Sequence, residues 1–297
     1  MKSNPRLIVQ HRLMFAAIVP ILLGISFAFQ PPLLWQIIAL GPLVALLGLP
    51  HGALDHSVAT ALWPLRTLRQ HAVFVAVYIG LTIAVLALWI VVPSTALAAF
   101  LIYSALHFSD DWRADLGQWQ RLPLGASIIA LPALVYKSEV AVLFGFLTSE
   151  PTATLFADLL QKIAIAAIIA SAVCLTFTVR RAPWVTVEYG LLVATALFTP
   201  PLIYFVLYFC ALHSPRHFLL TANQLRLTPL QALRAAVPIL VATMAFTGLG
   251  ASVLAVFTPS FEPVILQIVF VGLAAVTVPH MLLTAVFAAK PARSVDI

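Results

Sequence analysis

The sequence predicts an all-α fold, a polytopic transmembrane helix bundle that occupies residues 1–297 as a single domain. Hydrophobic residues make up 62% of the chain and charged residues only 9%, which lies far outside the composition of soluble domains. The mean hydropathy is +1.06. Apolar stretches follow one another almost from end to end, and the polar interruptions between them are too short to form a separate soluble domain.

The first apolar segment follows Met1-Lys-Ser-Asn-Pro-Arg6 and superficially resembles a signal peptide. No small-residue cleavage site follows it and the chain stays apolar, so we interpret it as the first span. The two shortest segments, 96–109 and 184–198, are expected to tilt or to enter the membrane only partway. About ten spans (8–10) are predicted in all, at 13–29, 33–50, 71–92, 96–109, 122–146, 152–177, 184–198, 201–220, 235–257 and 263–288.

Lys and Arg predict the orientation of these segments, because the cytoplasmic connections of membrane proteins carry an excess of both. The turns on the opposite side contain proline and acidic residues instead, as at Pro200-Pro201 and Glu262-Pro263. This pattern favours an N-in, C-in arrangement with an even number of helices. It places these basic residues on the cytoplasmic side: Lys2, Arg6, Arg12, Arg66, Arg69, Arg113, Arg121, Arg180, Arg181, Arg226, Arg234, Lys290 and Arg293.

The net charge of +6 does not indicate a nucleic-acid partner, because the basic residues occur singly or in pairs between apolar segments. Cys174 and Cys210 both lie inside apolar runs and form no disulfide framework or thiolate metal motif. We expect membrane lipid to be the main surrounding of this chain.

Two histidines stand four residues apart at the end of an apolar segment, in His213-Ser-Pro-Arg-His217. Four residues are about one helical turn, so both imidazoles can face the same point. Ionisable groups in membrane segments are costly and usually functional, and paired imidazoles are common metal ligands. Pro215 removes one helical hydrogen bond, so we expect a kink between the two histidines.

Three further histidines also lie near the predicted cytoplasmic ends of apolar segments. His51 stands in Gly48-Leu-Pro-His51-Gly, where the proline and the glycines predict a helix break. His107 ends the fourth segment and His280 lies in the cytoplasmic half of the last. Five histidines from four helices would thus share one depth in the membrane, which predicts that they meet.

Histidines from several helices can surround one ion, and neutral imidazole suits iron, copper and zinc. Four histidines without a carboxylate would leave up to two of six positions open on an Fe(II) centre, as O₂ chemistry requires. The alternative triad of two histidines and one carboxylate would need Asp55, Asp110 or Glu188 as a ligand. We expect these acids instead to accept a hydrogen bond from the distal nitrogen of a ligating ring.

Several residues keep more than one interpretation. A single histidine near a membrane interface is commonly a packing or headgroup residue. His56 is either a ligand or such an interfacial group, and His280 is a ligand, a partner of a ligand or part of a substrate pocket. The aromatic side chains of Tyr204, Tyr208 and Phe209 are candidates for substrate binding, since an aromatic helix beside a metal would suit a long polyene. Packing is the alternative role for all three.

Three motifs together resemble those of the Brp/Blh family of integral-membrane β-carotene 15,15′-dioxygenases. They are Gly48-Leu-Pro-His51-Gly-Ala-Leu-Asp55-His56, His107-Phe-Ser-Asp110 and His213-Ser-Pro-Arg-His217, in the family's order and with its separations. The resemblance implies that the chain cleaves the central double bond of β-carotene or a related carotenoid with O₂, giving two all-trans-retinal molecules. It implies Fe(II) bound by His51, His107, His213 and His217, with no catalytic residue beyond the metal centre. It also implies a bacterial inner membrane, where the retinal could pass to a rhodopsin.

Two other functions remain as alternatives. A histidine-rich membrane desaturase or hydroxylase would need about eight clustered histidines, and only one pair here has the HxxxH spacing. A proton-coupled transporter that uses histidines as a relay would place polar residues across the whole membrane depth. In this sequence they concentrate on one predicted side.

Overall fold

The computed structural model describes residues 5–29, 31–257 and 260–289, and every secondary-structure element in these ranges is helical. The N-terminal half contains α1 (Pro5–Ala28), α2 (Leu33–Leu43), η1 (Val44–Gly48), η2 (Leu49–Gly52), α3 (Asp55–Leu62), α4 (Leu68–Val91), α5 (Pro93–Ser109), η3 (Asp110–Trp112), α6 (Gln118–Ala130), α7 (Pro132–Val135) and α8 (Lys137–Gly145). The C-terminal half contains α9 (Glu150–Thr178), α10 (Pro183–Phe198), α11 (Pro201–Val206), η4 (Leu207–His213), α12 (Ser214–Gln224), α13 (Pro229–Phe257) and α14 (Phe261–Ala289).

Six helical segments of the described chain are long and apolar enough to cross a membrane, fewer than the ten predicted. The difference comes from segments that the sequence makes apolar but that fold as short or broken helices. The predicted span 122–146 is divided into α6, α7 and α8, α5 has 17 residues, and α10 has 16. The six are Leu7–Ala28, Leu33–Leu62, Leu68–Val91, Glu150–Thr178, Pro229–Phe257 and Phe261–Ala289.

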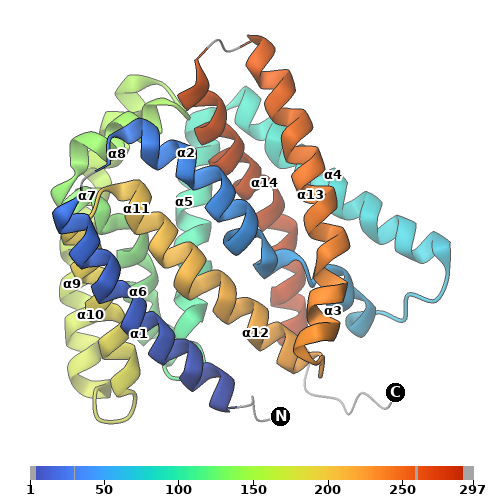
Figure 1. Cartoon of the computed structure of the whole chain (residues 1–297), viewed down its shortest axis with the longest axis horizontal. Coiled ribbons are helices and arrows are strands. Elements are labelled where there is room, and N and C mark those ends of the chain that lie inside the picture. Colours follow the sequence, from blue (N-terminus) through green and yellow to red (C-terminus); the bar gives the residue numbers. More distant parts are fainter. Residues whose placement is uncertain (1–4, 30, 258–259, 290–297) are drawn as a thin grey trace.

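The helices form one bundle around α14 and the broken helix α11–η4–α12 (Figure 1). α14 packs against α4, α13 and α2, while α6 packs against both α5 and α9. α1 packs along α10 and reaches η4 and α12. This arrangement brings η2, α5, η4, α12 and α14 to the centre of the molecule, although they are far apart in the sequence.

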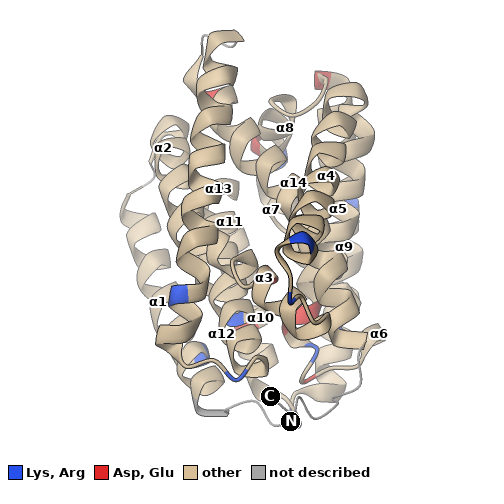
Figure 2. Cartoon of the chain, turned by 90° about the vertical axis from the view of Figure 1, so that its right-hand side faces the viewer, with Lys and Arg blue, Asp and Glu red and all other residues tan. Residues whose placement is uncertain are grey.

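The exterior of the bundle is apolar. Ile90 on α4, Phe177 on α9 and Val256 on α13 each expose more than three quarters of their surface, a surface that lipid solvates better than water does. Most Lys and Arg lie in the half of the bundle that contains α12 and the N-terminal part of α6 (Figure 2). Both features agree with a helix bundle in a membrane.

Two π-helical segments lead into histidines, and each is followed by a proline. η1 passes into the short 3₁₀-helix η2, which contains His51, at the Leu49-Pro50 step where the sequence predicts a break. η4 ends at His213, and α12 begins with Ser214 and Pro215. A π-helix contains one extra residue per turn and is frequent at functional sites. Here the two π-segments displace the following histidines from the positions that a regular α-helix would give them.

Candidate functional site

Five histidine rings from four separate parts of the chain converge in the bundle. His51 comes from η2, His107 from α5, His213 and His217 from η4 and α12, and His280 from α14. All are buried except His217, which is half-buried. The structure therefore brings together the four histidines that the resemblance singles out and adds His280.

Four of the rings form a closed cycle of neighbours, and the fifth lies beside all four. In the order His51, His213, His107, His280, neighbouring ring centres are 5.6, 4.8, 5.8 and 5.0 Å apart, the last distance closing the cycle back to His51. The centre of the His217 ring lies 6.2 Å from that of His51, 6.1 Å from His213, 6.0 Å from His107 and 4.9 Å from His280. Each ring thus faces several others across a common space.

Each of these eight separations lies within the range expected for two imidazoles bound to one ion. A metal–nitrogen bond of about 2.1 Å puts the ring centre about 3.2 Å from the ion, so ligating rings have centres about 4.5 to 6.4 Å apart. Among the described residues, no group of three or more His, Cys, Asp or Glu already meets the spacing of a metal site. The rings share one region without forming a closed coordination shell.

Unpartnered nitrogen atoms are the second feature of this site. The Nε2 atoms of His107, His213, His217 and His280 are buried and have no hydrogen-bond partner. Buried polar atoms are almost always hydrogen-bonded, so four such atoms in one place require an explanation. A metal ion bound between them would satisfy all four.

Hydrogen bonds donated by Nδ1–H fix the orientation of three rings. The Nδ1–H of His51 donates to the carbonyl oxygen of Gly48 at 2.6 Å, that of His213 to Oδ1 of Asp111 at 3.1 Å, and that of His280 to Oδ1 of Asp55 at 2.7 Å. This pattern leaves Nε2 of each ring as the atom with a free lone pair. Neutral imidazoles held in this way are the usual form of metal-binding histidine.

Asp111, rather than the expected Asp110, is the acid that accepts a hydrogen bond from His213. Asp110 forms an ion pair with Arg121 near the surface. Asp110 and Asp111 lie three and four residues after His107, so helical spacing places both near the face of that ring and does not by itself choose between them. Its Oδ2 accepts a hydrogen bond from the hydroxyl of Tyr208 at 2.7 Å. Burial would raise the pKa of Asp111, but His213, Arg216 and Tyr208 hold that pKa below its ordinary value.

Glu188 does not contact any of the five histidines, contrary to the expectation that it would accept from a ligand. It accepts hydrogen bonds from both terminal nitrogens of Arg216, at 3.1 and 2.5 Å, and from Nε1 of Trp112 at 3.0 Å. Arg12 forms a further ion pair with it at 3.3 Å. Since Arg216 stands between His213 and His217, Glu188 anchors the helix that carries both rings.

His56 lies outside the cluster. Its Nε2 is 3.0 Å from Nδ1 of His71, and the two rings stack with their centres 5.1 Å apart. Although His56 directly follows Asp55 in the sequence, its ring pairs with His71 on α4 and not with the five clustered rings. The interpretation of His56 as an interfacial group therefore fits its position, and the ligand interpretation does not.

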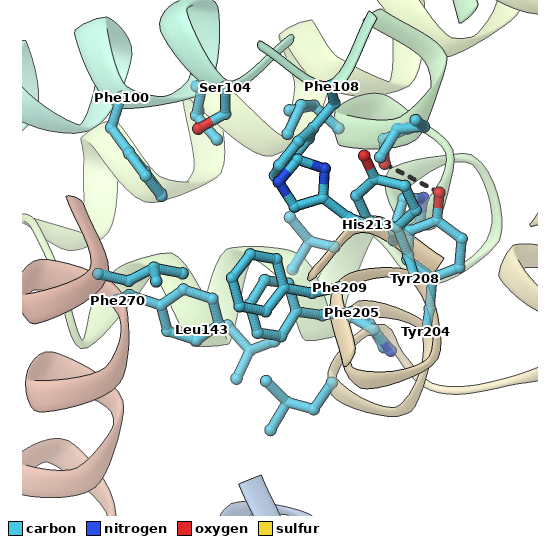
Figure 3. A pocket seen from close by; sticks show the side chains of 18 of the residues that line it. Phe100, Ser104, Phe108, Leu143, Tyr204, Phe205, Tyr208, Phe209, His213 and Phe270 are labelled. Carbon is cyan, nitrogen blue, oxygen red and sulfur yellow. Dashed lines mark hydrogen bonds between the residues drawn. The ribbon is translucent and has the colours of Figure 1, made fainter. Parts of the chain in front are cut away.

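An apolar cavity opens beside the histidine rings. His51, His107 and His213 line one end of it, and mainly phenylalanine, leucine and other apolar side chains line the rest. Tyr204, Tyr208 and Phe209, the three aromatic candidates, are all part of its wall (Figure 3). The hydroxyls of both tyrosines bond to protein groups, Tyr204 to the carbonyl of Ile128 and Tyr208 to Asp111. The tyrosine rings and Phe209 thus contribute apolar surface to the cavity.

Phe209 links the cavity to the cluster. Its ring meets that of His51 edge-on at 5.2 Å and stacks on that of His213 at 5.6 Å between centres. Gly48 makes room for it, because a Cβ at that position would lie 2.6 Å from Cε1 of Phe209. The carbonyl oxygen of Gly48 also accepts a hydrogen bond from the hydroxyl of Ser214 at 2.8 Å. The glycine is therefore needed for the close approach of η1 to η4.

A protein-family model described as beta-carotene 15,15′-dioxygenase matches residues 42–288, a range that includes all five histidines. The chain belongs to this family. The beta-carotene 15,15′-dioxygenase of an uncultured marine bacterium, 66A03, is 33% identical over 251 residues, which are 81% of this chain and 90% of that relative. No solved structure matches the chain. The resemblance drawn from the three histidine motifs is confirmed, and the chain is an enzyme of the beta-carotene 15,15′-dioxygenase family.

Proposed function

We propose that the chain is a membrane-embedded, iron-dependent dioxygenase that cleaves the 15,15′ double bond of β-carotene with O₂. One carotenoid and one O₂ give two all-trans-retinal molecules, so no reductant is consumed. The observation that carries the proposal is the convergence of histidine rings at the end of an apolar cavity, in a member of this family. The histidine cluster suits a metal that reacts with O₂, and the apolar wall of the cavity suits the hydrocarbon chain of a carotenoid.

Fe(II) is the proposed cofactor, and His51, His107, His213 and His217 are its proposed ligands. Three of these rings present a buried and unpartnered Nε2, and the fourth, His51, is turned by its bond to Gly48. An all-imidazole donor set suits iron, with copper and zinc as chemical competitors. When bound, iron would supply the O₂ chemistry that alkene cleavage requires.

The side chains of the cavity position the substrate and exclude water. The rings of Phe205 and Phe209 stack with their centres 5.3 Å apart, and Phe270 lies 5.1 Å from Phe205. Such a wall gains free energy by burying apolar polyene surface, and it gives a long conjugated chain a flat surface to lie against. The described residues that line the cavity include no Asp, Glu, Lys or Arg, in keeping with a cleavage that needs little proton transfer.

Location in a bacterial inner membrane is part of the proposal. A carotenoid dissolves in the hydrocarbon core of a bilayer far better than in water, so it would enter the cavity laterally between helices. The six long apolar helices and their apolar exterior support this location. The product would remain in the same membrane, where a rhodopsin could take it up.

The alternative functions lack an observation in their favour. A di-iron desaturase or hydroxylase would need more histidines than the five that converge, and His56 and His71 pair elsewhere. A proton-relay transporter would need polar groups along its path, whereas the cavity beside the cluster is lined by apolar residues. Carotenoid cleavage is the function that both features favour.

Production of retinal in bacteria that accumulate β-carotene tests this proposal. Cells that express the wild-type chain should contain retinal, and cells that express His213→Ala or His217→Ala should contain little or none at equal protein levels. The matched control is His56→Ala, which removes a histidine outside the cluster and should retain activity. If the wild type formed neither retinal nor an apocarotenal of another length and bound no iron, the proposal would be wrong.

A further inference from the structure

We propose that His280 is a fifth nitrogen ligand of this centre, held in position by Asp55 and Tyr78. The inference rests on the proposed function, since it concerns the same metal ion, and it goes beyond the four histidines that the motifs identify. His280 stands alone on α14, without a second histidine at helical spacing. Sequence spacing therefore does not assign it a role.

The ring of His280 lies as close to three of the other rings as those rings lie to one another. Its centre is 5.0 Å from that of His51, 4.9 Å from His217 and 5.8 Å from His107. Its Nε2 is buried without a partner, and the residue is 1% exposed. A histidine that served only packing would be expected to have both buried nitrogens hydrogen-bonded.

The second nitrogen of His280 has the hydrogen bonds of a metal ligand. Its Nδ1–H donates to Oδ1 of Asp55 at 2.7 Å, and Oδ2 of Asp55 accepts from the hydroxyl of Tyr78 at 2.8 Å. The same hydroxyl is 3.3 Å from the carbonyl oxygen of Val276 on α14. Carboxylates bonded in this way fix the tautomer and the direction of a ligating ring.

The same arrangement occurs at His213, a proposed ligand. His213 donates to Asp111, and Asp111 accepts from Tyr208, so each ring belongs to a His–Asp–Tyr series. The two aspartates also have matching positions, because Asp55 follows His51 by four residues and Asp111 follows His107 by four. The segment from His51 to Asp55 thus supplies one ring of the cluster and the acid that orients His280. The segment from His107 to Asp111 supplies another ring and the acid that orients His213.

Iron binding by purified protein in detergent tests the inference, with His280→Ala compared with wild type, His217→Ala and His56→Ala. We expect His280→Ala to lower the affinity for Fe(II) by about 100-fold or more, and Asp55→Asn to lower it by about 10-fold. Iron K-edge X-ray absorption of the wild type should show five imidazole scatterers. The spectrum of His280→Ala at saturating iron should show one fewer, and His56→Ala should resemble the wild type.

Two results would contradict the role of His280 as a ligand without contradicting the proposed function. One is wild-type affinity and coordination in His280→Ala, and the other is a wild-type spectrum with four imidazoles in a protein that forms retinal. The second result is decisive even if His280→Ala does not fold, because it needs no variant. Failure of the proposed function differs from both, since the wild type itself would bind no iron, or His217→Ala would bind it equally well.

Discussion

At the scale of single residues, the cluster depends on carboxylates that bind histidines across the bundle. Asp111 and Asp110 are adjacent in the sequence but have opposite roles. Asp111 is buried and accepts from His213, whereas Asp110 pairs with Arg121 near the surface. The difference arises from packing, because Asp111 bonds to Tyr208 and His213 of η4, whereas Asp110 faces Arg121.

Replacing Asp111 with asparagine should weaken metal binding while preserving the shape of the site. The amide oxygen can still accept from His213, but the negative charge that raises the basicity of the ring is lost. We expect the affinity for Fe(II) to fall by about 10- to 100-fold, measured by titration of the purified protein. The control is Asp110→Asn, for which we expect the wild-type affinity. Equal effects of the two substitutions would contradict the role assigned to Asp111.

Sequence reasoning located the histidines but not all of their partners. His51, His107, His213 and His217 stand in compact motifs whose spacing and apolar surroundings mark them, and Pro50 marks the break at η2. The contact of His280 with Asp55 joins residues 225 positions apart, and only the packing of α14 against α3 reveals it. Asp111 is adjacent to Asp110, and only the contacts of η4 show that Asp111 is the acid that reaches His213.

At the scale of elements, the site depends on helices that approach one another closely or depart from α-geometry. α5, which carries His107, lies against α6 at Gly125. A Cβ at Gly125 would contact the carbonyl oxygen of Ala105 and lie 2.8 Å from Cβ of Ser109. Backbone atoms cannot move away as a flexible side chain can. The close approach of the two helices therefore requires glycine at position 125.

Gly125→Ala should therefore separate α5 from α6 and displace His107. We expect a loss of about 1–3 kcal/mol in the free energy of unfolding, as for other overpacking substitutions, together with weaker iron binding. Thermal unfolding in detergent measures the first effect. The control is Gly190→Ala in α10, where an added Cβ has no atom within 4 Å and alanine favours the helix. A Gly125→Ala protein as stable as wild type would contradict the close contact.

The helical segments themselves and the break at Pro50 were largely predictable, but the other interruptions were not. Hydropathy places a helix at each of the ten predicted segments, because burial in lipid or in the bundle requires the same apolar residues. Hydropathy does not distinguish a continuous span from the three short helices within 122–146. The π-helices η1 and η4 were also not predicted, since a change from α to π hydrogen bonding leaves no pattern in composition.

At the scale of the whole molecule, a membrane setting would account for both the apolar exterior and the proposed substrate. The apolar exterior would contact lipid, the cavity would receive a lipid-soluble polyene, and the histidines would hold the metal away from water. The orientation remains a prediction based on Lys and Arg, which predict that both ends of the chain face the cytoplasm.

Reporter fusions test this orientation. Green fluorescent protein fused after the last residue should fluoresce, and alkaline phosphatase at the same position should be inactive, because the C-terminus is expected in the cytoplasm. Alkaline phosphatase inserted at Glu150, in a turn expected on the opposite side, should be active. The reverse pattern at both positions would contradict the N-in, C-in arrangement.

Removal and return of the metal tests the central claim most directly. Purified protein treated with a chelator should lose the ability to convert β-carotene into retinal, and Fe(II) should restore it to two retinal molecules per carotenoid cleaved. Zn(II), which binds imidazole but has no redox chemistry, should bind without restoring activity. Retinal formation by the metal-free protein, or equal restoration by Zn(II), would contradict the account of these histidines as an iron site for carotenoid cleavage.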